Sequence, residues 1–282
     1  MDFADYWKLL TPIYEAGEAK AIVRLLFEER YHLSMADILC GKVTELSADD
    51  QAELEKIMQR LEKGEPVQYI LGHAMFCGRS FHVNDQVLIP RPETEELCRW
   101  IIDRYTTPAS PCSHPRVLDV GTGSGCIAAT LALDIPGSQV TGWDISLQAL
   151  DVARGNVAAL GARATVEIED ALMPRTDERQ WDLIVSNPPY IMTSERATLP
   201  INVRDYEPEM ALFAPGEFSA LFYIRITNYA CDHLRHGGEL FFELNPLTAD
   251  RVCEHLTDMH FTDIEVRKDQ FGKIRFLRAV HP

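Results

Sequence analysis

The chain has 282 residues, of which 46% are hydrophobic and 25% charged, the composition of a globular protein with one or two domains. Its formal net charge of -16 disfavours a protein that binds nucleic acid through a basic surface, but permits a basic protein partner. The seven cysteines are scattered and form no C-x-x-C pair, so we expect no metal site and a reducing compartment. There is no signal-peptide pattern and no apolar run of membrane length. We therefore expect a cytoplasmic protein without membrane contact.

Residues 1–73 are expected to form a small helical domain. In the stretch 18–31, five residues follow helical spacing as a mostly apolar stripe: Ala21, Ile22, Leu25, Leu26 and Glu29. Ser47 and Asp50 form a capping-box pattern ahead of a second helix, which should end near Gly64. That helix carries its apolar residues on one face: Leu54, Ile57, Met58 and Leu61. No motif here indicates catalysis, so the domain is expected to be a structural bundle or a platform for a partner protein.

Residues 74–90 are expected to form a β-hairpin that links the helical domain to a second domain at 91–282. Short apolar runs alternate there with the turn formers Gly78, Asn84 and Asp85. A helix should then open at Pro90–Glu95, where proline and glutamate occupy first-turn positions, and run toward Tyr105. The Pro- and Ser-rich stretch 107–115 is expected to be a loop.

From residue 116 onward, predicted strands and helices alternate. Strands are expected at 116–120, 139–143, 165–168, 181–186 and 239–244, and helices at 125–133, 147–160 and 219–234. Two further strands near 264–267 and 274–279 are expected to form a terminal antiparallel pair. This order predicts an α/β fold with a mostly parallel, Rossmann-like sheet covered by helices on both faces.

A glycine-rich loop follows the first of these strands. It consists of Gly121, Thr122, Gly123, Ser124 and Gly125. Glycines allow a sharp turn and the close approach of a ligand, but the G-x-G-x-G spacing differs from that of nicotinamide enzymes and disfavours a dehydrogenase. Asp144 ends the next strand, about 20 residues past the loop, where a carboxylate can bind both hydroxyls of a ribose. The alternative is that Asp144 caps the following helix.

Two weaker candidates end the third predicted strand. Asp170 could accept a hydrogen bond from the exocyclic amine of adenine, and Ala171 could offer its backbone N–H to the ring. Asp170 could equally be an ordinary turn residue.

The segment Asn187-Pro188-Pro189-Tyr190, called here the signature segment, is the most specific motif of the chain. It follows the apolar strand 181–186, and its prolines must stop that strand because proline cannot donate to a sheet ladder. In open α/β sheets, ligands bind at the carboxyl ends of the strands. The Asn187 side-chain oxygen and the Pro188 carbonyl can accept the two hydrogens of an NH2 group, and the Tyr190 ring can lie against a planar substrate.

Together these motifs resemble the class I S-adenosylmethionine-dependent methyltransferases. The resemblance implies that the glycine loop lies under the methionine part of S-adenosylmethionine, with Asp144 on the ribose and Asp170 and Ala171 beside the adenine. It also implies that the signature segment is the catalytic motif of the branch that methylates amino and amide nitrogens. The resemblance further implies that Asn187 lies next to the cofactor as well as the substrate.

Three further segments are similar to the release factor glutamine methyltransferases: 66–72 with Phe76 after it, 88–95, and 203–208 continuing to Ala211 and Leu212. This resemblance implies methyl transfer from S-adenosylmethionine to the glutamine of the Gly-Gly-Gln motif of peptide chain release factors, by a protein expected to be a monomer that does not bind nucleic acid directly. One departure concerns the stretch Glu243-Leu244-Asn245-Pro246, because the family often has a glycine shortly after the glutamate. The departure puts the shape of that loop in question.

Three other functions stay open from the sequence. A ribosomal-protein glutamine methyltransferase or a DNA or RNA adenine N6-methyltransferase would carry the same signature segment, although the second would need a basic groove. A non-catalytic module could bind release factor through the helical domain.

Arg91 and Glu93 could close the cofactor site, or they could form a surface ion pair and a helix cap.

Overall fold

The structure, a computed structural model, describes residues 1–108, 110–214 and 220–282. Their contacts divide the chain into two compact units. The first unit comprises residues 1–73 and 199–206, and the second comprises 74–198 and 207–282. Among the helices of the described residues, none combines the length and the hydropathy that a membrane span needs. Ser219, the predicted first residue of a helix, lies outside the described residues.

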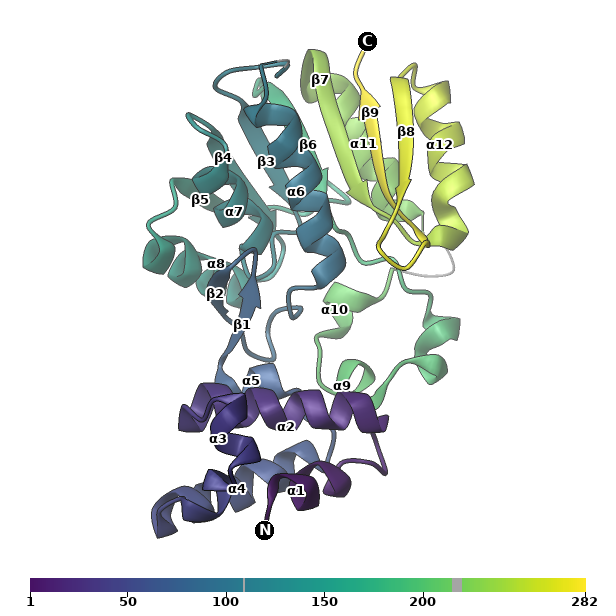
Figure 1. Cartoon of the computed structure of the whole chain (residues 1–282). Coiled ribbons are helices and arrows are strands. Elements are labelled where there is room, and N and C mark those ends of the chain that lie inside the picture. Colours follow the sequence, from purple (N-terminus) through teal and green to yellow (C-terminus); the bar gives the residue numbers. More distant parts are fainter. Residues whose placement is uncertain (109, 215–219) are drawn as a thin grey trace. The chain divides into compact units, whose positions relative to one another are not determined.

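The first unit is helical, and its two longest helices build its core. Its elements are α1 (Phe3–Leu9), α2 (Ala16–Tyr31), α3 (Met35–Leu39), η1 (Lys42–Glu45), α4 (Ala48–Leu61), α5 (Val67–Leu71) and α9 (Ile201–Arg204) (Figure 1). The predicted apolar face of α4 is confirmed, since all four of its residues are buried, and Ser47 caps this helix by accepting the Asp50 N–H at 3.1 Å.

The buried face predicted for α2 is wrong, because the observed buried face is rotated from it by part of a turn. The buried residues are Ala19, Val23, Leu26 and Phe27, and of the five predicted residues only Leu26 is fully buried. Helix α2 has apolar residues around much of its circumference, so more than one stripe fits the helical period. The ring of Phe27 decides between them, because it packs against Tyr6 of α1 with ring centroids 5.6 Å apart.

The segment 199–206 returns to the first unit after the signature segment. Gly64, just past the end of α4, has φ +89°, and a Cβ added there would lie 2.8 Å from Cγ2 of Ile201. The Tyr206 hydroxyl donates to the Lys63 carbonyl at 3.0 Å. Glycine at position 64 therefore serves both the left-handed backbone and the close approach of the returning segment.

The second unit is built on a seven-stranded sheet in the order β5-β4-β3-β6-β7-β9-β8 (Figure 1). Its strands are β3 (Arg116–Val120), β4 (Gln139–Asp144), β5 (Ala164–Ile168), β6 (Trp181–Ser186), β7 (Leu234–Glu243), β8 (Thr262–Lys268) and β9 (Ile274–Val280). Strands β3 to β7 pair in parallel, and β9 is antiparallel to both β7 and β8. The predicted parallel sheet and terminal antiparallel pair are confirmed. Strand β7 starts five residues earlier than expected, because it continues through Gly237 and Gly238 with a register shift against β6.

Helices cover both faces of this sheet, as the alternating order predicts. They are α6 (Pro92–Thr106), α7 (Cys126–Asp134), α8 (Leu147–Leu160), α11 (Leu221–His233) and α12 (Ala249–Asp258). Successive residues of a strand point to opposite faces: Leu183 and Val185 of β6 join a core with α6 and α7, whereas Ile184 joins one with α11 and α12. All six residues of β6 are buried, which explains its continuous apolar pattern.

The remaining elements are short, and all of their residues except His73 belong to the second unit. They are the hairpin β1 (His73–Phe76) and β2 (Arg79–His82), η2 (Thr193–Thr198), α10 (Glu209–Leu212) and η3 (Pro246–Thr248). Residues 87–89, expected to alternate within the hairpin, form no strand. The chain after the signature segment is fixed by a bridge between Ile191 and Phe213. These short helices, like α12, have no counterpart among the sequence-based predictions.

Candidate active site

The candidate site lies at the carboxyl edge of the parallel strands. Val120 of β3 pairs with Trp143 of β4 on one side and with Ser186 of β6 on the other. The glycine loop, Asp144 and the signature segment, each of which starts at or just after these positions, therefore share one edge of the sheet. Ser186 Oγ donates to the Val120 carbonyl at 2.7 Å and ties the ends of the two central strands together.

The glycine loop turns tightly against the end of β4. The backbone N–H groups of Gly121 and Thr122 both donate to the Trp143 carbonyl at 2.8 Å. Gly121 and Gly123 have φ values of +77° and +54°, and a Cβ added to either would meet nothing within 4 Å. These two glycines therefore supply left-handed backbone beside open space, which suits a ligand that lies close to the loop.

A buried carboxylate, Asp119, lies beneath the loop. Its Oδ2 accepts the Thr122 hydroxyl at 2.6 Å and the Ala128 N–H at 3.1 Å, whereas its Oδ1 is buried and has no hydrogen-bond partner in the described chain. Burial raises the pKa of Asp119 from its ordinary 3.8 to about 7. A buried acid with an unpartnered oxygen is suited to a cationic ligand.

Replacing Asp119 by asparagine should stabilise the cofactor-free protein more at pH 8 than at pH 5. The folded-state pKa is about 7 and the unfolded value 3.8, so the carboxylate destabilises the fold increasingly as pH rises between these values. A shift of this size changes the free energy of unfolding by on the order of 2 kcal/mol between pH 5 and 8. Thermal unfolding of wild type and Asp119→Asn at both pH values measures this. An equal difference at both, or the same trend in the exposed control Asp103→Asn, would contradict the prediction.

Asp144 is held by two backbone N–H groups. Its Oδ2 accepts from Gly123 and its Oδ1 from Ser146, each at 2.9 Å. The following helix is capped by Ser146, whose hydroxyl accepts the Ala149 N–H, and not by Asp144. Burial raises the pKa of Asp144, although its backbone hydrogen bonds oppose this. Each carboxylate oxygen keeps a second lone pair, so Asp144 can also accept from the hydroxyls of a ribose.

Asp170 and Ala171 lie past the end of β5, in the turn that follows it. Asp170 Oδ1 accepts the Leu172 N–H at 2.8 Å, and its carbonyl accepts the Met173 N–H at 3.0 Å. Asp170 therefore has the turn role that the sequence left open, and its second carboxylate oxygen is not used in that turn. Ala171 is half-buried against the core beneath α11 and α12.

The signature segment is anchored on a buried acid and a threonine. Asn187 Nδ2 donates to Thr94 Oγ1 at 3.1 Å, and the Thr94 hydroxyl donates to Glu243 Oε2 at 2.7 Å. The Tyr190 hydroxyl donates to Glu243 Oε1 at 3.2 Å, so Glu243 holds both ends of the segment. Burial raises the pKa of Tyr190 well above its ordinary value of 10, and the charge of Glu243 adds to this. Tyr190 therefore stays protonated and acts as a donor.

The loop after Glu243, which departs from the family pattern, has a defined shape in this structure. Asn245 Nδ2 donates to the Tyr190 carbonyl at 3.1 Å, and Asn245 Oδ1 accepts the Leu247 N–H at 2.9 Å as the cap of η3. Its backbone N–H donates to the Tyr223 hydroxyl at 3.2 Å. The Asn245 side chain therefore makes a further contact that holds the signature segment. A glycine could not make this contact, because it has no side chain.

Arg91 pairs with the buried carboxylate of Glu207, which also accepts the Ile89 N–H at 3.2 Å. Arg91 is thus fixed in a partly buried ion pair, and Glu93 lies in the first turn of α6 next to Thr94. No role for Thr94, Glu207 or Asp119 follows from the sequence patterns. Only Asp119 had a visible signal, because a carboxylate is unusual within an apolar strand.

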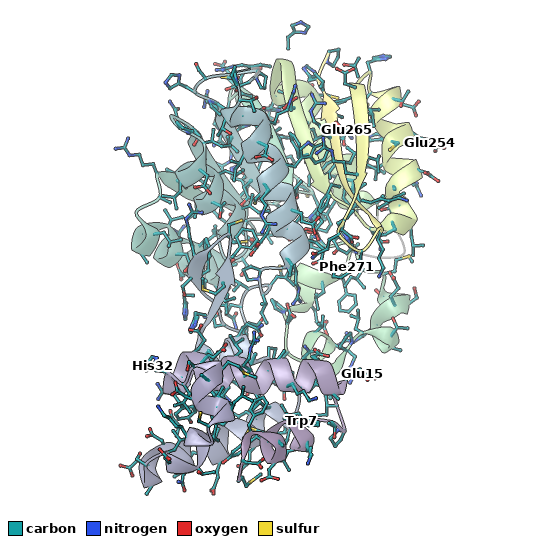
Figure 2. The ribbon with its side chains drawn as sticks, viewed as in Figure 1. Trp7, Glu15, His32, Glu254, Glu265 and Phe271 are labelled. Carbon is teal, nitrogen blue, oxygen red and sulfur yellow. The ribbon has the colours of Figure 1, made fainter. Side chains whose placement is uncertain are left out.

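The turn between β8 and β9 lies at the same edge of the sheet as Glu243, since Glu243 pairs with Phe276 near the start of β9. This turn carries Phe271, whose side chain is 70% exposed at the tip of the hairpin (Figure 2). Arg275, at the foot of the turn, donates to the Leu244 carbonyl at 3.4 Å and to the Tyr190 hydroxyl at 3.5 Å. The hairpin therefore contributes a cation to the anchor of the signature segment.

Comparisons with known proteins show which families this chain is similar to. Residues 106–201 match the family described as "Methyltransferase small domain", and residues 12–72 match the "PrmC N-terminal domain". The release factor glutamine methyltransferase of Bacteroides thetaiotaomicron is 43% identical, over 96% of this chain and 95% of that protein. The release factor glutamine methyltransferase of Chlorobaculum tepidum is 46% identical, over 75% of this chain and 72% of that protein.

A solved structure of a methyltransferase from Pyrococcus furiosus has the same fold, with a TM-score of 0.53 and 18% identity over 72% of this chain and 89% of that one. The sheet order, the glycine loop and these neighbours define the second unit as a class I S-adenosylmethionine-dependent methyltransferase fold. Two release factor glutamine methyltransferases are 43% and 35% identical to this chain over 96% of its length, and its amino-terminal part matches the PrmC N-terminal domain. The chain therefore belongs to the release factor glutamine methyltransferase family.

Proposed function

We propose that this protein transfers a methyl group from S-adenosylmethionine to the side-chain amide nitrogen of the glutamine in the Gly-Gly-Gln motif of peptide chain release factors. One observation carries the proposal: the pairing of β3 with β6 brings the glycine loop and the signature segment to adjacent positions on one sheet edge. A ligand cradle thus lies beside acceptor groups suited to an NH2 group. Membership of the family supports the choice of substrate.

S-adenosylmethionine, when bound, supplies an activated methyl group on a sulfonium centre. The residues that suit it are the glycine loop, Asp119 and Asp144, with Asp170 and Ala171 for the adenine and Asn187 beside the reacting end. Open space over the loop and the unpartnered oxygen of Asp119 support this fit.

The residues of the signature segment would act on the acceptor nitrogen. An amide nitrogen is a weak nucleophile, because its lone pair is delocalised into the carbonyl. If Asn187 Oδ1 and the Pro188 carbonyl accept its two N–H hydrogens, they fix the direction of the nitrogen and stabilise the positive charge that develops on it. Tyr190 would lie against the flat face of the amide, and Pro189 keeps the segment out of the sheet. No general base is required if the proton leaves to solvent afterwards.

The proposal includes a monomer that acts in the cytoplasm. Seven free thiols, with no disulfide among them, support a reducing compartment. The net charge of -16 argues against direct binding of nucleic acid and against the adenine N6-methyltransferase alternative. A ribosomal-protein glutamine acceptor would fit the same site chemistry, so the substrate has to be tested directly.

The test is methyl transfer from radiolabelled S-adenosylmethionine to three acceptors: purified release factor, the same factor with its motif glutamine changed to alanine, and adenine-containing DNA. We expect label on the unmodified release factor alone, at about one methyl group per molecule at completion. Label on DNA, or equal label on both release factors, would overturn the proposed substrate. Labelling of a ribosomal protein but not of release factor would select the other glutamine acceptor.

A further inference from the structure

Thr94 forms the middle of a buried hydrogen-bonded chain that runs from Glu243 to Asn187. Thr94 and Glu243 are each 2% exposed. The two hydrogen bonds, of 2.7 Å and 3.1 Å, join residues from the first turn of α6, the end of β7 and the end of β6. The fold thus brings together three side chains from distant parts of the sequence behind the signature segment.

When Glu243 is ionised, the donors and acceptors of this hydrogen-bonded chain permit one direction only. An ionised carboxylate accepts but cannot donate, so Glu243 takes the single hydroxyl hydrogen of Thr94. The Thr94 oxygen can then only accept, and the group that Asn187 turns toward it must be the NH2 group. The Asn187 side-chain oxygen consequently points away from Thr94. A flipped amide would place its oxygen against the Thr94 oxygen with no hydrogen between them.

Burial is the largest influence on the Glu243 carboxyl and raises its pKa. Hydrogen bonds from Thr94 and Tyr190 and the positive charge of Arg275 oppose the effect of burial, which raises the pKa of Glu243. Glu93 is the nearby carboxylate that adds to the raising effect. The negative charge of Glu243 is therefore stabilised by two hydrogen-bond donors and by Arg275, and destabilised by burial and by Glu93.

We propose that Thr94, held by Glu243, is a positioning residue that sets the Asn187 amide with its oxygen toward the acceptor nitrogen. In this orientation Asn187 presents an acceptor to the N–H of the substrate, whereas the flipped amide would present donors to donors. The inference rests on the proposed function for its kinetic consequence, but the orientation itself is a property of the protein alone. Thr94 would touch neither substrate nor cofactor and would act through Asn187.

The test compares three variants. Thr94→Val keeps the shape but removes the hydroxyl, and Thr94→Ser restores it. Thr227→Val is the matched control, because Thr227 is also fully buried but its hydroxyl has no partner in the described chain. For Thr94→Val we expect kcat to fall about 10- to 100-fold, with KM for release factor and Kd for S-adenosylmethionine within about threefold of wild type. Thr94→Ser should keep kcat within about threefold, and Thr227→Val should match wild type.

A second readout does not depend on activity. In nitrogen-15 spectra of the cofactor-free protein, the side-chain NH2 signal of Asn187, assigned by its loss in Asn187→Ala, should be slow to exchange in wild type and Thr94→Ser. It should exchange faster in Thr94→Val. An unchanged signal or unchanged kcat in Thr94→Val overturns the inference, and so does a Thr94→Ser variant as impaired as Thr94→Val. If wild type methylates no release factor, the proposed function fails, and the spectra still decide the orientation.

Discussion

Replacing Asn187 by alanine is expected to lower turnover by about 10²- to 10³-fold, the size of effect seen when one preorganised polar group is removed from an active site. The variant loses the side-chain oxygen proposed to accept an N–H of the substrate, and it also leaves the Thr94 hydroxyl without its donor. The affinity for S-adenosylmethionine should fall by less than about threefold, because most proposed cofactor contacts come from other strands. Single-turnover methylation of release factor and calorimetric titration of the cofactor measure the two quantities.

Asn228→Ala is the matched control, because Asn228 is an exposed asparagine of α11 that hydrogen-bonds only His255 among the described residues, at 3.0 Å. It should retain full turnover. Equal losses of turnover and cofactor affinity in Asn187→Ala would show that Asn187 serves the cofactor rather than the acceptor nitrogen.

Replacing Asp144 by asparagine is expected to weaken binding of S-adenosylmethionine by about 10- to 100-fold, as expected for the loss of hydrogen bonds to a charged group. The carboxylate already accepts the N–H groups of Gly123 and Ser146, and the ribose hydroxyls would need its remaining lone pairs. Asparagine has only one acceptor oxygen, and its NH2 group would face one of these N–H donors. The loop and the ribose would therefore compete for a single oxygen.

The control for this change is Asp151→Asn on α8, where the carboxylate is 78% exposed and pairs only with Arg154 in the described chain. Its affinity for the cofactor should equal that of wild type in the same titration. If Asp144→Asn bound S-adenosylmethionine as tightly as wild type but melted at a lower temperature, Asp144 would be a loop support and not a cofactor ligand.

The parallel strands could be predicted from the sequence because their pattern is local. Strand β6 matches its prediction residue for residue, since a strand buried on both faces is a continuous apolar run and the prolines after it fix its end. The glycine loop and Asp144 were equally visible, because a sharp turn needs glycine and a strand end can be counted from it. Helix α2 was harder, since its apolar residues fit more than one face and only its partners choose between them.

The anchor of the signature segment could not be predicted, because it depends on contacts across the chain. Thr94 and Glu243 are 149 residues apart in sequence, and nothing in a threonine of a first helical turn signals a partner so distant. The pair of Arg91 with Glu207 spans 116 residues in the same way. Sequence patterns located the groups that would contact ligands, whereas the residues that orient those groups emerged only from the fold.

The return of residues 199–206 to the first unit has a consequence for biosynthesis. A helical unit at the start of a chain would ordinarily fold as soon as it leaves the ribosome. Here Ile201 packs beside Gly64 and Tyr206 hydrogen-bonds Lys63, so the first unit cannot be complete until residue 206 has been made. Three strands that lead to the site, β3, β4 and β6, are synthesised before then. The amino-terminal unit is therefore the first to be started, but it is completed only after these three strands of the sheet have been synthesised.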